Sequence, residues 1–182
     1  TFLARDKTGA LWIGTWGAGV VRFQGGKFES IASADGLSGD QIWSLHCDRD
    51  GGLWIGTWHG GLNRLSARYF QAWGKPEGLS HDNTRSVLID RQGAVWTATA
   101  GGGVNRIADG KVTQVTTAQG LASNESAGLH EAADGAMWIT SYTGGVARYQ
   151  NGKVRNYGLK EGLPALDARV VFMPKLAGGQ LH

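Results

Sequence analysis

The sequence has little of what marks several broad classes of protein. Cys47 is the only cysteine in 182 residues, so an intrachain disulfide is excluded and the redox compartment stays undetermined. No apolar run approaches the roughly 18 residues that a membrane-spanning helix requires. No signal peptide opens the chain, which begins at Thr1, and we expect a fragment of a longer protein.

Charge and motifs exclude further classes. The net charge is +3, and the basic residues form no run of five or more, which argues against nucleic-acid binding. The sequence has no Gly-x-Ser-x-Gly motif, no phosphate-binding loop and no His/Cys spacing typical of zinc. The segment DRDG at 48–51 begins like a calcium loop, but it lacks the third acidic position and the closing Glu, which indicates a turn. We therefore expect no cofactor, no metal and no enzymatic activity.

What the sequence does contain is a repeat of 42 residues. The segment LWIGTWGAGVVRF at 11–23 returns as LWIGTWHGGLNRL at 53–65, and looser copies follow at 95–107 and 137–149. The first tryptophans of the four copies are Trp12, Trp54, Trp96 and Trp138. A Gly-Leu pair keeps the same period, with its glycines at Gly36, Gly78, Gly120 and Gly162. Self-similarity at a period of 20–50 residues indicates a solenoid, a propeller or an array.

Each repeat predicts four antiparallel strands. In the second copy, short β-favouring segments at 41–48, 53–57, 60–65 and 69–73 are separated by Gly or Asp turns. Four strands in about 42 residues match one blade of a β-propeller. The predicted fold is therefore an all-β propeller of four-stranded blades, forming a single region over residues 1–182. We place the blades at 1–35, 36–77, 78–119 and 120–161, with 162–182 starting a fifth.

The two ends of the chain compete for one position in this scheme. The segments TFLARD at 1–6 and RVVFM at 169–173 both fit the first strand of a blade. We therefore expect four blades and the start of a fifth, either cut from a larger ring or completing one by self-association. Such self-association would use the open blade edges, because unpaired edges and exposed blade faces tend to bind other chains.

The combined repeat resembles a known family. The pattern Asp-x-x-Gly-x-Leu-Trp-Ile-Gly-Thr followed by Gly-Gly-Leu-x-Arg, seen in DRDGGLWIGTWHGGLNRL at 48–65, is similar to the two-component regulator propeller repeat. The fourth copy departs from the pattern, because Ala132 replaces the Asp. The resemblance implies the periplasmic, ligand-sensing part of a bacterial receptor. It also implies a signalling output domain outside this chain, such as a histidine kinase or a diguanylate cyclase.

Residues that recur in every repeat are expected to serve the blade itself. Arginines follow ten residues after each first tryptophan, at Arg22, Arg64, Arg106 and Arg148. We expect them to bind turn carbonyls or the turn carboxylates Asp6, Asp48 and Asp90, and to tie neighbouring blades together. The alternative is a ring of arginines that binds an anion.

Function is expected where the repeats differ on a common face. In a propeller, the loops between second and third strands and the loops that enter each blade open on the same side. The predicted ligand-binding residues on these loops are Trp16, Trp58, His59, His81, Asp82, Asn83, Asn124 and Tyr142. Aromatic faces beside a few polar groups are typical of small-molecule sites and suit sugar rings. The alternatives are that Trp16 and Trp58 pack between blades and that His59 and His81 are simply solvated.

Three hypotheses of function follow. The first is a non-enzymatic sensor that binds a small molecule, such as a glycan fragment, at the propeller mouth. The second is a scaffold for protein interactions. The third is an enzyme similar to the streptogramin lyases, whose propellers carry a similar Gly-x-Leu-Trp motif, with His81, His130 and Glu131 as candidates. Adjacent strand residues such as His130 and Glu131 point to opposite faces, which disfavours a shared site.

Overall fold

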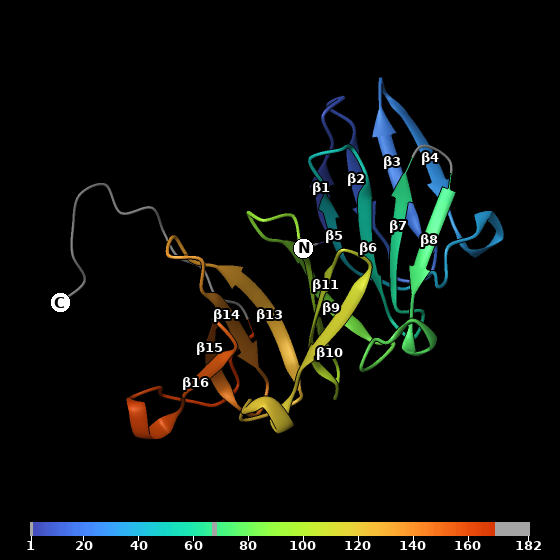
Figure 1. Ribbon diagram of the computed structural model, residues 1–182. Helices are drawn as coiled ribbons and strands as arrows, with labels where there is room; N and C mark the ends of the chain where they lie inside the picture. Colours follow the sequence, from blue (N-terminus) through green and yellow to red (C-terminus); the bar gives the residue numbers. More distant parts are fainter. Residues whose placement is uncertain (1, 67–68, 170–182) are drawn as a thin grey trace, which may run out of the picture.

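The computed structural model describes residues 2–66 and 69–169 and contains four separate antiparallel sheets (Figure 1). Blade 1 comprises β1 (Leu3–Arg5), β2 (Leu11–Gly14), β3 (Val20–Gln24) and β4 (Lys27–Ile31). Blade 2 comprises β5 (Ile42–Cys47), β6 (Leu53–Thr57), β7 (Leu62–Ser66) and β8 (Tyr69–Trp73). Blade 3 comprises β9 (Thr84–Ile89), β10 (Val95–Thr99), β11 (Gly103–Ala108) and β12 (Lys111–Val115). Blade 4 comprises β13 (Ser126–Glu131), β14 (Met137–Ser141), β15 (Gly145–Gln150) and β16 (Lys153–Tyr157).

Within each sheet the strands follow chain order, and the first strands line the inside of an arc. Strand β5 contacts β1 on one side and β9 on the other, and β9 in turn contacts β13. The sheets fan outward from these inner strands, as Figure 1 shows. The predicted propeller of four-stranded blades is confirmed. The first-strand slot of blade 1 is filled by β1, whereas the proposed fifth-blade strand at 169–173 lies almost entirely outside the described residues.

Short 3₁₀ helices connect the blades. They are η1 (Ser33–Asp35), η2 (Lys75–Glu77), η3 (Thr117–Gln119) and η4 (Leu159–Glu161). Each helix ends at the glycine of a repeated Gly-Leu pair, in the left-handed conformation that glycine tolerates best. Gly78, for example, ends η2 with φ of 98°. The Gly-Leu marker of the sequence is therefore the stop signal of each connecting helix.

The apolar core lies between the blades. Three clusters of buried side chains occupy the junctions of blades 1 and 2, 2 and 3, and 3 and 4. Trp12, Trp54 and Trp96 project into these junctions, where their exposed fractions are only 7%, 6% and 4%. Each indole is covered by apolar side chains of the following blade. Such cover is needed because a lone blade cannot bury both faces of its sheet.

A carboxylate organises the turn before the second strand of blades 1 to 3. In blade 2, Asp48 Oδ2 accepts hydrogen bonds from Trp54 Nε1 at 3.1 Å and from Arg64 Nε at 2.9 Å and Nη2 at 2.7 Å. Asp90 accepts from Trp96 Nε1 at 2.8 Å, and Arg106 Nε lies 3.9 Å from the same carboxylate. The predicted bond between an arginine and a turn carboxylate is thus confirmed in blade 2, and in blade 3 the two groups form a looser ion pair.

The expectation that these bonds tie neighbouring blades is wrong. The turn carboxylate and the arginine belong to the same blade, because the loop between first and second strands lies beside the third strand. Blades 1 and 4 also differ in the partner: Arg22 pairs with Glu29 at 3.4 Å, and Arg148 pairs with Asp134 at 2.6 Å. In blade 4, Asp134 serves this purpose because Ala132 occupies the usual Asp position.

Candidate functional site

The candidate site is the propeller mouth, where the inner strands begin and the loops between second and third strands end. Each of the inner strands β5, β9 and β13 has a β-bulge at its start, between residues 42 and 44, 84 and 86, and 126 and 128. The extra residues are Trp43, Arg85 and Ala127. A bulge re-aims its extra side chain away from the regular alternation of the strand. The three blades therefore place different side chains at one structural position.

An aromatic cluster forms the part of the mouth that belongs to blades 1 and 2. The ring centres of Trp16 and Trp43 lie 5.6 Å apart, those of Trp43 and Trp58 5.3 Å, and those of Trp16 and Trp58 6.0 Å. The ring centre of Phe2 lies 6.3 Å from that of Trp43. Trp16 is 61% exposed, which is unusual for so large an apolar surface. We call Trp16, Trp43 and Trp58 the tryptophan platform.

Backbone pairing holds this platform in place. Trp16 forms an isolated bridge with Gln41, across the junction of blades 1 and 2. Trp58 N donates to Gln41 O at 2.9 Å, so both loops are fixed to the residue that precedes β5. Glycine is required next to these loops, because Gly61 has φ of 75° and a Cβ there would collide with Trp73 O. The platform is thus built on paired backbone and not on a free loop.

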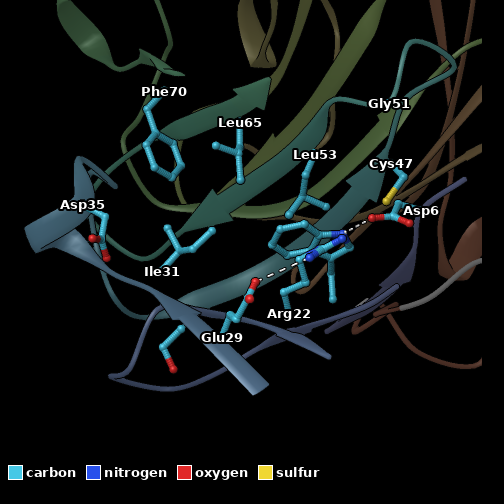
Figure 2. Close-up of a pocket in the computed structure, with 12 residues that line it drawn as sticks. Asp6, Arg22, Glu29, Ile31, Asp35, Cys47, Gly51, Leu53, Leu65 and Phe70 are labelled. Atoms are coloured by element: carbon cyan, nitrogen blue, oxygen red, sulfur yellow. Dashed lines mark hydrogen bonds and ion pairs between the residues drawn. The ribbon is translucent and has the colours of Figure 1, made fainter. Parts of the chain in front are cut away.

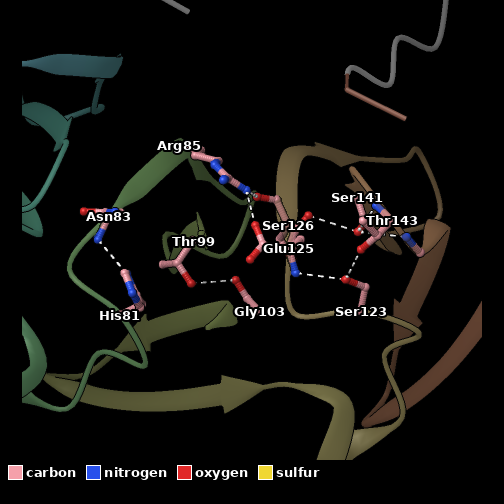
Figure 3. Close-up of polar contacts among 11 residues, drawn as sticks. His81, Asn83, Arg85, Thr99, Gly103, Ser123, Glu125, Ser126, Ser141 and Thr143 are labelled. Carbon is pink, nitrogen blue, oxygen red and sulfur yellow. Dashed lines mark hydrogen bonds and ion pairs between the residues drawn. The ribbon is translucent and has the colours of Figure 1, made fainter. Parts of the chain in front are cut away.

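Charged side chains form the part of the mouth that belongs to blades 3 and 4. Arg85 Nη1 donates to Glu125 Oε2 at 2.9 Å and to Ser126 O at 3.2 Å, a pairing visible in Figure 3. The guanidinium of Arg85 also lies 4.6 Å from the centre of the Tyr142 ring, within the range of a cation–π contact. Arg169 lies 5.4 Å from the same ring and pairs with Asp167 at 3.0 Å.

His59 occupies a backbone position that favours glycine. Its φ is 73°, in the left-handed region, whereas the equivalent positions in blades 1 and 3 are Gly17 and Gly101. Its backbone N–H donates to Asn83 Oδ1 at 2.7 Å, and its ring centre lies 5.2 Å from that of Trp58. A side chain kept where glycine would be less strained is a candidate for function.

His81 and Asn83 are held by each other. Asn83 N donates to His81 Nδ1 at 3.0 Å, as Figure 3 shows, and the Asn83 side chain is buried. Burial lowers the pKa of His81, and the nearby charge of Lys75 lowers it further. A neutral imidazole that accepts at Nδ1 carries its proton on Nε2. His81 is therefore a hydrogen-bond donor at its free nitrogen.

Asp82 and Asn124 have contacts inside the chain. Asp82 Oδ1 accepts from Lys75 N at 2.8 Å, and Asn124 Oδ1 accepts from Thr117 N at 2.8 Å. In blade 1, Asp40 makes the same contact with Ser33 N at 2.7 Å. These side chains fix the start of each connecting 3₁₀ helix, so the structure shows a packing contact for both. A further role in ligand binding stays a prediction.

Sequence reasoning missed Trp43 and Arg85. Both lie within segments that we assigned to strands, where regular alternation gave them no special position. The signal was present, because residues 43, 85, 127 and 169 are spaced by 42 and are Trp, Arg, Ala and Arg. The period of 42 residues thus marks these four residues as equivalent, although most other positions of this strand vary as well.

His130 and Glu131, the adjacent candidates for an enzymatic role, do not share a site, as expected. His130 lies beside Trp138 in the register of β13 and β14. The Glu131 carboxylate faces the neighbouring blade, where its Oε2 accepts from Arg91 N at 3.0 Å and lies 3.6 Å from Arg91 Nε. Within residues 2–66 and 69–169, no group of three or more His, Cys, Asp and Glu side chains is arranged to hold a metal ion.

Clefts also occur at the blade junctions. A cleft of about 600 Å³ lies between blades 1 and 2, lined by Asp6, Arg22, Glu29, Cys47 and Phe70 among others (Figure 2). Clefts of about 470 Å³ and 330 Å³ occupy the next two junctions. Because the three clefts repeat the same turn carboxylate, tryptophan and arginine, we assign them to blade packing.

The fold and the repeated blades define the chain as a β-propeller of four-stranded blades. Residues 36–59 match the family model of the two component regulator propeller. This match confirms the resemblance to the two-component regulator propeller repeat in blade 2. No curated protein matches the chain significantly in sequence. No helix among the described residues is long and apolar enough to cross a membrane.

Solved propeller structures are similar to the chain in fold. The extracellular domain of the hybrid two component system BT3049 from B. thetaiotaomicron is 22% identical with a TM-score of 0.52, over 89% of this chain and 28% of that one. Virginiamycin B lyase from Staphylococcus aureus is 15% identical with a TM-score of 0.69, over 85% and 54%. The gluconolactonase XC5397 from Xanthomonas campestris is 17% identical with a TM-score of 0.58, over 84% and 59%. The chain thus spans less than two thirds of the length of each.

Proposed function

We propose that this propeller is the ligand-sensing part of a bacterial signal-transduction receptor and binds a small molecule at its mouth. The observation that carries the proposal is the tryptophan platform, with Trp16 61% exposed on a backbone-paired surface. Exposed apolar patches rimmed by polar groups mark binding sites. The left-handed His59 beside the platform supports the same location.

The chemistry of the mouth fits a carbohydrate fragment. The flat indole rings would stack on the apolar face of a sugar ring, and Arg85, Glu125 and His81 would bond to its hydroxyl groups. Of the loop residues predicted from the sequence, Trp16, Trp58, His59, His81, Asn83 and Tyr142 belong to this proposed site. Trp43 and Arg85 join them.

The proposed receptor context rests on the repeat and on the fold. The repeat is that of two-component regulators, and one similar structure is the extracellular domain of a hybrid two component system. We infer a periplasmic location and an output domain outside this chain, a histidine kinase or a diguanylate cyclase. The binding event at the mouth would be passed to that domain.

A thermal-shift screen tests the proposal. The purified chain is melted with a panel of defined disaccharides and trisaccharides, both neutral and uronic-acid-containing, and with other small metabolites. A ligand present at 100 times its Kd adds about 2.7 kcal/mol, which raises the Tm by roughly 5–10 °C in a domain of this size. One chemical class that gives such a shift supports the sensor, whereas a cooperative melt that no compound moves favours the interaction scaffold.

Two variants test the location. Trp16→Ala and the double substitution Trp58→Ala, His59→Ala are expected to remove the shift while leaving the melt of the free chain cooperative. Tyr69→Ala is the matched control, because Tyr69 is 79% exposed on β8, the outermost strand of blade 2. If the double variant keeps the full shift, the tryptophan platform is not the binding site.

A further inference from the structure

The bulge position of the inner strand joins two kinds of chemistry at the mouth. In blade 2 this position is Trp43, and in blade 3 it is Arg85. Trp43 packs on Trp16 from the loop of the preceding blade, with ring centres 5.6 Å apart. Because the repeat spacing is constant, Arg85 stands to Trp58 as Trp43 stands to Trp16. Arg85 therefore borders the tryptophan platform.

Arg85 keeps hydrogen-bond donors for a ligand. Its side chain is only 14% exposed, and its Nη1 donates to Glu125 Oε2 and Ser126 O. The Tyr142 ring, whose centre lies 4.6 Å from the guanidinium, packs against the same group. Within the described part of the chain, Nε and Nη2 of Arg85 have no acceptor. These two nitrogens form an edge that can bind two oxygens at once, either of a carboxylate or of adjacent hydroxyl groups.

The charges beside this edge favour hydroxyl groups over a carboxylate. Glu125 pairs with Arg85 at 2.9 Å, and Asp167 pairs with Arg169 at 3.0 Å, so each arginine is neutralised by its own partner. The carboxylate side chains remain 42% and 47% exposed. A ligand carboxylate placed on Arg85 would come close to Glu125, and like charges that meet on binding weaken it strongly.

Glu125 also supplies an acceptor near the histidine of the mouth. Its Oε1 accepts from no described residue and would lie 3.4 Å from a Cβ at Gly101, while a Cβ at Gly102 would lie 2.8 Å from His81 Cβ. The two glycines thus let Glu125 and His81 approach the same loop of blade 3. Burial lowers the pKa of His81 and the charge of Glu125 raises it, as expected for neighbouring groups. Donors and an acceptor therefore alternate here, as sugar hydroxyl groups require.

We propose that the mouth takes a neutral sugar with adjacent hydroxyl groups and rejects the corresponding uronic acid, and that Arg85 and Glu125 determine this specificity. The inference rests on the proposed function, because it concerns the same site. Arg85 Nε and Nη2 donate to two hydroxyl oxygens, and Glu125 Oε1 accepts from one of these hydroxyls. Glu125 also cancels the charge that would otherwise attract an acidic sugar to Arg85.

Matched pairs of disaccharides test the specificity. Cellobiose, lactose and mannobiose are each compared with the form in which the non-reducing CH₂OH group is oxidised to a carboxylate, by isothermal titration calorimetry of the full chain. In a pair that binds, the neutral member should bind at least about 10-fold more tightly. Tighter binding of the acidic member would overturn this inference and leave the sugar sensor supported. Binding of no pair would contradict the sugar sensor itself, and this inference with it.

Glu125→Gln tests the residue that excludes the acid. Glutamine keeps the shape and can still accept from Arg85, but the negative charge is lost, so the acidic member should gain roughly 10-fold or more relative to the neutral one. Glu29→Gln makes the same change in the ion pair with Arg22 on the outermost strand of blade 1, and should leave the preference unaltered. An unchanged preference in Glu125→Gln would overturn the role of Glu125.

Arg85→Gln tests the donor side independently. This variant should weaken the neutral sugar by roughly 10-fold and give the acidic sugar no advantage, because the cation is removed together with its donors. Unchanged binding of the neutral sugar to a folded Arg85→Gln variant, checked by circular dichroism, would overturn the role of Arg85.

Discussion

Asp48 is the acceptor on which the turn of blade 2 is built. Its Oδ1 accepts from Gly52 N at 2.6 Å and Asp50 N at 2.9 Å, while its Oδ2 accepts from Trp54 and Arg64. One carboxylate thus accepts hydrogen bonds from the turn, from the Trp54 indole at the junction with blade 3, and from Arg64 on the third strand. The Arg64 guanidinium also lies 5.6 Å from the Trp54 ring, which completes the group of three.

Replacing Asp48 is expected to destabilise the chain. Asp48→Ala leaves the Trp54 N–H and a partly buried guanidinium without their acceptor, a loss of about 2–3 kcal/mol in the free energy of unfolding. Urea denaturation of the two proteins measures the difference. Asp50→Ala, at an exposed position of the same turn, should change the free energy by less than about 0.5 kcal/mol. Equal effects of the two substitutions would contradict the role given to Asp48.

The stabilisation by Asp48 is expected to depend on pH. Burial raises the pKa of this carboxyl, but the hydrogen bonds from Arg64, Gly52 and Trp54 outweigh burial and lower the pKa below its ordinary value. A lowered carboxyl pKa gives stability that is present above the unfolded value, about 4, and is lost as the pH falls through the folded pKa. The difference between the unaltered chain and Asp48→Ala should therefore be constant from pH 7 to 5 and shrink below pH 4. A difference that stays constant to pH 3 would contradict this.

Cys47 is expected to react slowly with thiol reagents. Burial, together with the carboxylates of Asp6 and Asp48, raises the pKa of its thiol to about 11. Because the thiolate is the reactive form, alkylation by iodoacetamide at pH 8 should be roughly 100-fold slower than that of free cysteine. Mass spectrometry of timed samples measures the rate, and labelling in 6 M urea provides the control for an accessible thiol. Fast labelling of the folded chain would contradict the raised pKa.

Two kinds of residue at the mouth differ in how well the sequence predicted them. Trp16 and Trp58 were identifiable because they stand in loops, where the repeats vary and nothing in strand alternation competes. Trp43 and Arg85 were missed because their orientation depends on a β-bulge, which shifts the register by one residue. The spacing of 42 residues marks the two positions as equivalent but does not reveal the bulge. The partner of Arg22 was also not predictable, since Glu29 is reached across β3 and β4.

At the scale of the element, buried asparagines fix the loops that enter blades 2 and 3. Asn63 on β7 is fully buried, and its Oδ1 accepts from Ser38 N at 3.1 Å while its Nδ2 donates to Ser38 Oγ at 2.6 Å. Asn105 on β11 makes the same pair of bonds with Ser80. The connecting loop is thus clamped to the third strand of the blade that it enters, which fixes one rim of the mouth.

Removing this clamp is expected to cost more than removing Asn156, a half-buried asparagine that binds the loop entering blade 4. Asn63→Ala removes a fully buried side chain together with both of its hydrogen bonds to Ser38, a loss of about 2–3 kcal/mol in the free energy of unfolding. Asn156 makes analogous bonds to Ala122 N and Gly120 O but is only half-buried, so Asn156→Ala should cost about 1 kcal/mol or less. Chemical denaturation of both variants gives the comparison. A larger loss at Asn156 would show that burial does not decide the strength of the clamp.

At the scale of the whole molecule, the period of 42 residues predicted the number and order of the strands in each described blade. The Gly-Leu and Asp-x-x-Gly markers are local signals, and each one fixes a turn by itself. The partners across the junctions were predictable only as a class, because any apolar side chain of suitable volume can cover a tryptophan: Leu53, Val95 and Met137 do so in turn. What the local signals cannot specify is which faces are left uncovered.

The uneven coverage of the blades predicts uneven local stability. Within residues 2–66 and 69–169, blades 2 and 3 pack against a neighbour on both faces, whereas blades 1 and 4 do so on one. An array of this kind unfolds from its ends. In native-state hydrogen exchange of this chain, amides of β6 and β10 should exchange roughly 10-fold or more slowly than those of β2 and β14, equivalent to about 1.4 kcal/mol. Equal protection in all four blades would show that the chain unfolds as one cooperative unit.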